Sequence, residues 1–119
     1  MPVRPNPGDP SRFLPLPPAA LHILLSLARE PRHGYGIMQD VARQSGGQYK
    51  LGPGTLYDNL QRLLDQDLAE QSRKKSDDPR RRYYQLTALG RAVLEADVER
   101  LKSVVRHARS SLKPAGARP

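Results

Sequence analysis

The feature that most constrains this chain of 119 residues is a long apolar repeat near its C-terminus. From residue 94 onward, apolar side chains recur at alternating spacings of four and three, which is a heptad seam. The seam consists of Leu94, Val98, Leu101, Val105, Ala108 and Leu112. With Thr87 as N-cap, it predicts a helix over residues 87–112, about 38 Å long at about 1.5 Å per residue. We expect a second copy of the chain to cover this helix, and the alternative is packing on its own domain.

The two ends of the chain are predicted to be flexible tails. Seven of the twelve prolines fall within the first 18 residues, and proline supports neither a helix interior nor a strand ladder. We therefore expect a proline-rich tail over residues 1–17. A second short tail is expected over residues 113–119.

Three shorter helices are predicted between the first tail and the long helix. The first begins at Pro17 or Pro18 and is apolar around nearly its whole circumference, which predicts burial on both sides. The second covers about residues 35–44, and the third about residues 53–65. The third helix has one apolar stripe, formed by Leu56, Leu60, Leu63 and Leu64. Its opposite face is polar and carries Thr55, Asp58, Asn59 and Arg62.

Residues 68–73 and 81–86 read as two strands of a hairpin. Pro79 and a pair of aspartates between the strands suit its tip. The loop and its flanks carry a dense group of basic side chains: Arg73, Lys74, Lys75, Arg80, Arg81 and Arg82. The hairpin is therefore expected to carry most of the positive charge of the winged domain.

The order of elements predicts a mainly α fold with a small β-hairpin. Three helices and a two-stranded wing form a winged helix-turn-helix domain over residues 18–86, and the dimerisation helix follows over residues 87–112. The net charge of +8 and the pI of about 10.3 favour a polyanionic partner, which is a nucleic acid, a membrane surface or an acidic protein. There is no cysteine, and we expect no metal site, no cofactor and no membrane span.

Three short motifs stand in order along the chain. They are His33-Gly34-Tyr35-Gly36-Ile37, then Gly54-Thr55-Leu56-Tyr57, and then Arg82-Tyr83-Tyr84-Gln85-Leu86-Thr87-Ala88-Leu89-Gly90. Together they resemble the PadR (phenolic acid repressor-like) family, in its short subgroup with a single C-terminal helix. The resemblance implies a homodimeric repressor that binds double-stranded operator DNA. Asp58 departs from the family pattern, which often has proline there, so no family base contact is transferred to this position.

The predicted DNA contacts come from three places. The third helix would enter the major groove, the wing would contact phosphates, and the resemblance implies that Tyr35 reaches the DNA backbone. Tyr57 lies between the two faces of its helix, so packing and a phosphate contact both stay open. The full set is Tyr35, Lys50, Thr55, Tyr57, Asn59, Arg62, Arg73, Lys74, Lys75, Arg80, Arg81 and Arg82.

The predicted dimer interface combines the seam with the first helix. Leu21, Leu24 and Leu25 are expected to join it. The resemblance also implies a small apolar or aromatic effector at the dimer centre. The chain has no tryptophan to stack on such a molecule, which leaves Phe13 and the apolar first helix as candidates.

An enzyme is not expected, because the three histidines are scattered and no glycine-rich phosphate loop or nucleophile motif is present. The three histidines are His22, His33 and His107. The competing interpretation is a basic adaptor that uses the same winged helix for protein or RNA contacts. A DNA-binding repressor of this kind is expected in the cytoplasm, associated with the nucleoid when bound to DNA.

Overall fold

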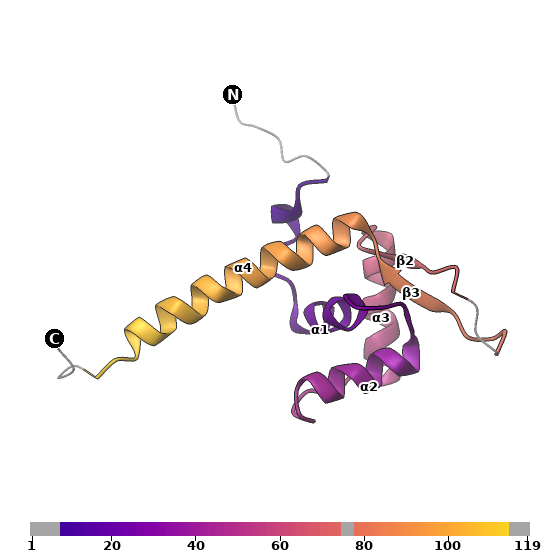
Figure 1. The fold of residues 1–119 in the computed structure, drawn as a ribbon, viewed down its shortest axis with the longest axis horizontal. Coiled ribbons are helices and arrows are strands. Elements are labelled where there is room, and N and C mark those ends of the chain that lie inside the picture. Colours follow the sequence, from indigo (N-terminus) through magenta and orange to yellow (C-terminus); the bar gives the residue numbers. More distant parts are fainter. Residues whose placement is uncertain (1–7, 75–77, 115–119) are drawn as a thin grey trace.

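The computed structural model describes residues 8–74 and 78–114 as a helical body from which one long helix extends (Figure 1). A short 3-10 helix, η1, comes first. The helices and strands are η1 (Pro10–Phe13), α1 (Pro18–Leu27), β1 (Arg32–His33), α2 (Gly34–Gln44), α3 (Pro53–Asp65), β2 (Ala69–Gln71), β3 (Tyr83–Leu86) and α4 (Ala88–Ser111). The predicted order of three helices, a hairpin and a long helix is confirmed.

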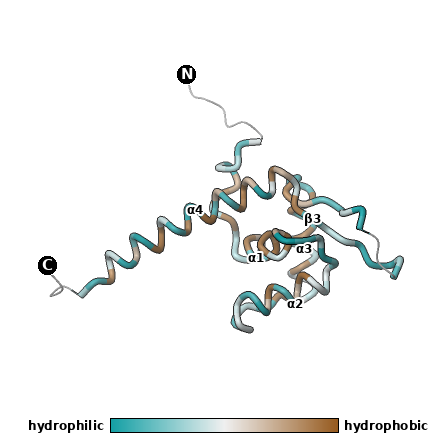
Figure 2. The backbone as a smooth tube through the Cα atoms, viewed as in Figure 1, coloured by the Kyte–Doolittle hydropathy of each residue, from teal (hydrophilic) through white to brown (hydrophobic). Residues whose placement is uncertain are grey.

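The hydrophobic core is built around α1. This helix packs against α2, α3, α4 and β3, and its side chains at Ile23 and Leu24 are fully buried. The apolar stripe of α3 faces it, with Leu56, Leu60 and Leu63 buried. Figure 2 shows hydrophobic colour in this body and hydrophilic colour along the hairpin. The burial of α1 from several sides agrees with its apolar circumference.

The predicted helix boundaries agree closely with the observed ones. The structure places α3 at Pro53–Asp65, with Pro53 in its first turn, where a missing N–H costs nothing. Helix α4 begins after Thr87, which caps it as expected. The strands of the hairpin are shorter than predicted, at Ala69–Gln71 and Tyr83–Leu86.

The sheet has a third strand, which the sequence analysis missed. Strand β1 pairs antiparallel with β3, with Arg32 opposite Tyr84 and His33 opposite Tyr83. Strand β2 pairs with the other edge of β3. Two residues are too few to show an alternating pattern, so β1 is defined by its partner strand. This pairing brings the start of α2 to the base of the wing.

The junction between the wing and α4 is fixed by close backbone packing. Thr87 accepts a hydrogen bond from Gly90 N at 2.8 Å and donates one to the carbonyl of Asp67 at 2.6 Å. A Cβ atom at Gly90 would overlap the carbonyl oxygen of Leu68. Glycine is therefore required for α4 to lie this close to the end of α3.

The prediction that residues 1–17 form a tail without helix is wrong for part of that segment. Residues 10–13 form η1, whose first residue is Pro10 and whose N-cap is Asp9. Proline is tolerated in a first turn, and η1 is only one turn long. It packs against α4, Phe13 and Leu14 contact the core, and Leu16 is buried. Residues 1–7 and 115–119 lie outside the described residues.

Two residues predicted for the dimer interface belong to the core of the chain itself. Leu24 is 0% exposed and Leu94 is 5% exposed. Neither has surface to offer to a second copy, so their assignment to an intermolecular contact is wrong. Apolar residues with the same spacing are therefore buried in the core of their own chain at these positions and lie on an exposed face further along α4.

Candidate nucleic-acid interface

Helix α3 presents the polar face expected of a recognition helix. Because Leu56, Leu60 and Leu63 are buried on one side, Thr55, Asp58 and Arg62 are exposed on the other. The Asn59 side chain is half-buried, and its amide nitrogen donates to the carbonyl of Thr55 at 2.8 Å. On this polar face, the exposed side chains nearest the N-terminus of α3 are thus those of Thr55 and Asp58.

The N-terminus of α2 lies beside α3 and is capped by a histidine. His33 Nδ1 accepts a hydrogen bond from the backbone N–H of Gly36 at 3.0 Å. Tyr35, in the first turn, is 60% exposed. Its side chain is therefore accessible, and its contact with a DNA backbone stays a prediction.

Tyr57 joins α3 to α2. A Cβ atom at Gly34 would collide with the phenol ring of Tyr57, so the ring lies directly against the glycine backbone. Tyr57 is nevertheless 51% exposed. Of the two alternatives for this residue, packing occurs, but against α2, and it leaves half of the side chain accessible.

The wing carries exposed basic side chains, some of which already have partners. Arg80 forms two ion-pair contacts with Asp78, both at 3.2 Å. The Arg80 side chain and its backbone N–H hold the pKa of the Asp78 carboxyl below its usual value. Lys74 Nζ lies 5.0 Å from the centre of the Tyr83 ring. Arg81 and Arg82 remain exposed.

Helices α2 and α3 and the wing meet at a cavity of about 290 Å³. Its lining combines cations with aromatic rings and one helix N-terminus. The lining residues are His33, Gly34, Tyr35, Tyr57, Arg80, Arg81, Arg82 and Tyr84. Five of the predicted DNA-contact residues are therefore brought together: Tyr35, Tyr57, Arg80, Arg81 and Arg82.

The remaining predicted contacts lie elsewhere on the surface. Lys50 is exposed in the connector before α3, and Arg62 is exposed towards its C-terminal end. Arg73 and Lys74 are exposed in the segment that follows β2 into the wing. Lys75 lies outside the described residues.

His33 was not among the predicted site residues. Histidine is not among the residues that usually cap a helix N-terminus, which are Ser, Thr, Asp and Asn, so its position before α2 gave no local signal of a cap. Burial, then the nearby Arg81 and Lys74, lower the pKa of His33 below its usual value of 6.5. The imidazole is therefore neutral near pH 7 while it caps α2.

The outer half of α4 is a second exposed surface. Among the described residues, the exposed large hydrophobic side chains lie in two places only. Tyr35 and Tyr57 border the basic cavity, and the others are on α4: Val98, Val104, Val105 and Leu112. Val104 was not part of the predicted seam.

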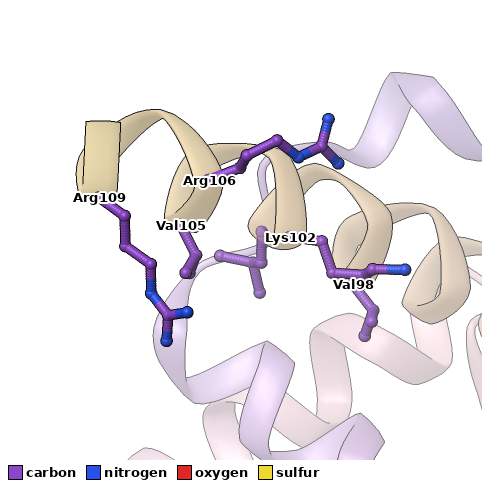
Figure 3. A pocket seen from close by; sticks show the side chains of 6 residues that line it. Val98, Lys102, Val105, Arg106 and Arg109 are labelled. Atoms are coloured by element: carbon purple, nitrogen blue, oxygen red, sulfur yellow. The ribbon is translucent and has the colours of Figure 1, made fainter. Parts of the chain in front are cut away.

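An open groove of about 510 Å³ runs along this part of α4 (Figure 3). Val98 and Val105 project from the same side of the helix. The groove has an apolar floor and a basic rim, with Val98, Leu101, Val105, Lys102, Arg106 and Arg109 as its lining.

Over residues 8–74 and 78–114, no helix has the length and apolar character needed to cross a membrane, and no cluster of metal-ligating side chains occurs.

Comparison with known proteins agrees with this architecture. Residues 23–96 match the model of the transcriptional regulator PadR-like family. The chain is 36% identical to the transcriptional regulator Rv3488 of Mycobacterium tuberculosis over 86 residues, which is 72% of this chain and 78% of the relative. This chain belongs to the PadR-like family of transcriptional regulators.

Solved PadR structures show the same fold. A PadR family transcription regulator from Clostridium difficile superposes with a TM-score of 0.68 at 25% identity, covering 79% of this chain and 97% of that one. A PadR-like regulator from Bacillus cereus gives a TM-score of 0.69 at 24% identity, covering 80% of this chain and 91% of that one. The prediction of a PadR-type winged helix with a C-terminal helix is confirmed.

Proposed function

We propose that this PadR-family regulator is a homodimeric repressor that binds an inverted-repeat operator in double-stranded DNA. Residues 18–86 bind the DNA, and residues 87–112 hold the two copies together. A protein with this role acts in the cytoplasm and associates with the nucleoid when it is bound.

The observation that carries DNA binding is the convergence of three elements on one basic cavity. The N-terminus of α2, the side of α3 at Tyr57 and three wing arginines line the same space. An α-helix fits the major groove, and flanking cations contact the phosphates that border it. Thr55, Asn59 and Arg62 would face base edges or phosphates, while Tyr35, Lys50, Arg73, Lys74 and Lys75 would extend the backbone contacts.

The observation that carries dimerisation is the bare apolar side of α4. Every residue from 102 to 111 is exposed, and Val105 alone is 48% exposed. A seam of this length is stable in water only when it is covered. A second copy supplies a matching seam, so Val98, Leu101, Val105, Ala108 and Leu112 would pack across a two-fold axis. The half-buried Leu21 and Leu25 of α1 complete the proposed interface.

We further propose that an effector binds along the groove on α4. An apolar floor with Lys102, Arg106 and Arg109 at its rim fits a small apolar or aromatic acid at the dimer centre. Such a molecule would favour one packing of the two α4 helices over another and thereby change the spacing of the recognition helices. Phe13 is half-buried against the core, so it is a poor stacking partner.

The decisive experiment measures affinity for the duplex upstream of the protein's own gene against random duplex at physiological salt. We expect a clear preference for the upstream duplex, and footprinting should show two protected half-sites about one helical turn apart. An equal affinity for both duplexes sinks the specific repressor. Tighter binding to RNA of the same sequence would instead favour the adaptor. Loss of the protein should raise transcription from the footprinted promoter.

A further inference from the structure

His33 and Arg81 come from different parts of the chain and lie next to each other in the lining of the basic cavity. The pairing of β1 with β3 sets His33 opposite Tyr83, and the two rings make an edge contact at 5.3 Å. Arg81 lies two residues before Tyr83, and its Nη1 atom is 3.5 Å from His33 Nε2. The sheet therefore fixes the imidazole while its outer nitrogen points towards the wing.

The helix cap decides which nitrogen of His33 carries the proton. A neutral imidazole has one acceptor nitrogen and one N–H donor. Nδ1 accepts from Gly36 N, so Nε2 must carry the hydrogen. The lowered pKa of His33, caused first by burial and then by Arg81 and Lys74, keeps the ring in this neutral form.

Two donors therefore face each other without an acceptor between them. A guanidinium has five N–H donors and no acceptor, so Arg81 Nη1 and His33 Nε2 form no hydrogen bond at 3.5 Å. Both atoms border the cavity of about 290 Å³. An oxygen that accepts from both nitrogens would complete the arrangement, and the exposed Arg82 in the same cavity favours an anionic oxygen.

We propose that His33 Nε2–H and the Arg81 guanidinium together bind one phosphate of the DNA backbone. This inference rests on the DNA-binding function proposed above and adds His33 to the residues that contact DNA. Tyr35 and Tyr57 line the same cavity, and the N-terminus of α2 adds its partial positive charge. The anion in the cavity is a DNA backbone phosphate rather than a free anion. The cavity lies beside the recognition helix α3, and the backbone of a bound duplex passes next to that helix.

The test compares His33→Asn with the parent protein on random-sequence duplex DNA, because a phosphate contact is independent of sequence. Asparagine caps helices well, so the variant should keep the α2 cap and lose only the Nε2 donor. In each protomer the variant loses one hydrogen bond to a charged phosphate. We expect the affinity for DNA to fall about tenfold for each such bond that is lost. The slope of log affinity against log salt should stay unchanged, because no charge is removed.

Arg81→Ala supplies the contrasting result. Removing this cation should weaken binding and also flatten the salt slope by about 0.9 for each lost phosphate contact. In the double variant the two losses should not add, since both residues bind the same phosphate. His107→Asn, an exposed histidine on α4, is the matched control and should bind like the parent.

The ring nitrogens give a readout that does not depend on variants. In spectra of histidine labelled with ¹⁵N, His33 should show the Nε2–H tautomer, and its Nε2 signal should shift when duplex is added. Binding of the parent with no loss in His33→Asn overturns the phosphate contact and leaves the DNA-binding function intact. The same shift with inorganic phosphate alone, without that loss of DNA affinity, overturns it in favour of a free-anion site. Failure of the parent to bind any duplex overturns both proposals.

Discussion

The inner and outer halves of α4 share one apolar spacing but have different surroundings. In the inner half, Val93 and Leu94 are buried against the body. Asp97, 0% exposed, pairs with Arg100 at 2.7 Å where the body ends. Beyond Leu101 every described residue is exposed. Apolar spacing thus indicates which side of a helix is buried, whereas the size of the body decides whether the cover comes from the same chain.

The largest expected effect comes from the anchor of the inner half. Gly90→Val places side-chain atoms where the Leu68 carbonyl lies, and a backbone carbonyl cannot rotate away as a side chain can. We expect a loss of at least about 3 kcal/mol in the free energy of unfolding, measured by urea denaturation. Gly54→Ala, at a helix glycine with open space around it, is the control and should change stability by about 1 kcal/mol or less. Equal stability of the two variants would mean that α4 does not dock this closely.

Leu94→Ala tests whether the inner half of the seam belongs to the core of its own chain. Removal of this buried side chain should cost about 2–5 kcal/mol. The loss should be the same at every protein concentration, because the contact is intrachain. A loss that disappears on dilution would return Leu94 to the dimer interface.

Val105→Lys tests the outer half. The new cation would enter an apolar groove already bordered by Lys102, Arg106 and Arg109, so the dimer should weaken by about 2–4 kcal/mol, which sedimentation would detect. Ser103→Lys, exposed on the same helix, is the control and should remain dimeric. A dimer that survives Val105→Lys unchanged would place the interface elsewhere.

Arg81→Ala combined with Arg82→Ala should separate DNA binding from both halves of α4. Affinity should fall on all duplex sequences, and the salt slope should flatten by about 3 to 4 for a dimer that loses four phosphate contacts. The double variant should match the parent protein in unfolding free energy and in sedimentation. Arg29→Ala is the control, and it should match the parent in DNA affinity as well. An unchanged slope would mean that the wing does not contact phosphates.

The smallest effect is the pH dependence of stability contributed by His33. Its pKa is lower in the folded state than the usual 6.5, so the unfolded chain binds more protons as the pH falls through that value. Stability should therefore decline below pH 6.5 and be fully present above it, because protonated Nδ1 cannot cap α2. The difference between the melting temperatures at neutral and acidic pH should be smaller for His33→Asn than for the parent protein. An identical decline in both proteins would contradict this role.

Much of the candidate site follows from local pattern. The apolar stripe of α3 predicts its polar face, and the run of basic residues predicts a charged wing. His33 shows the limit, because its cap and its place beside Arg81 depend on the pairing of β1 with β3. No local periodicity exists in a strand of two residues to predict that pairing.

The bounds of α3, the cap of α4 at Thr87, the charge of the wing and the PadR resemblance could be predicted from the amino-acid sequence, since each depends on residues close together in the chain. The packing of η1 on α4, the burial of Leu24 and Leu94 inside their own chain, and the meeting of two donors in one cavity became visible only in the folded chain. These contacts join segments far apart in sequence. Their formation depends on backbone approach and on the size of the body, which spacing alone does not encode.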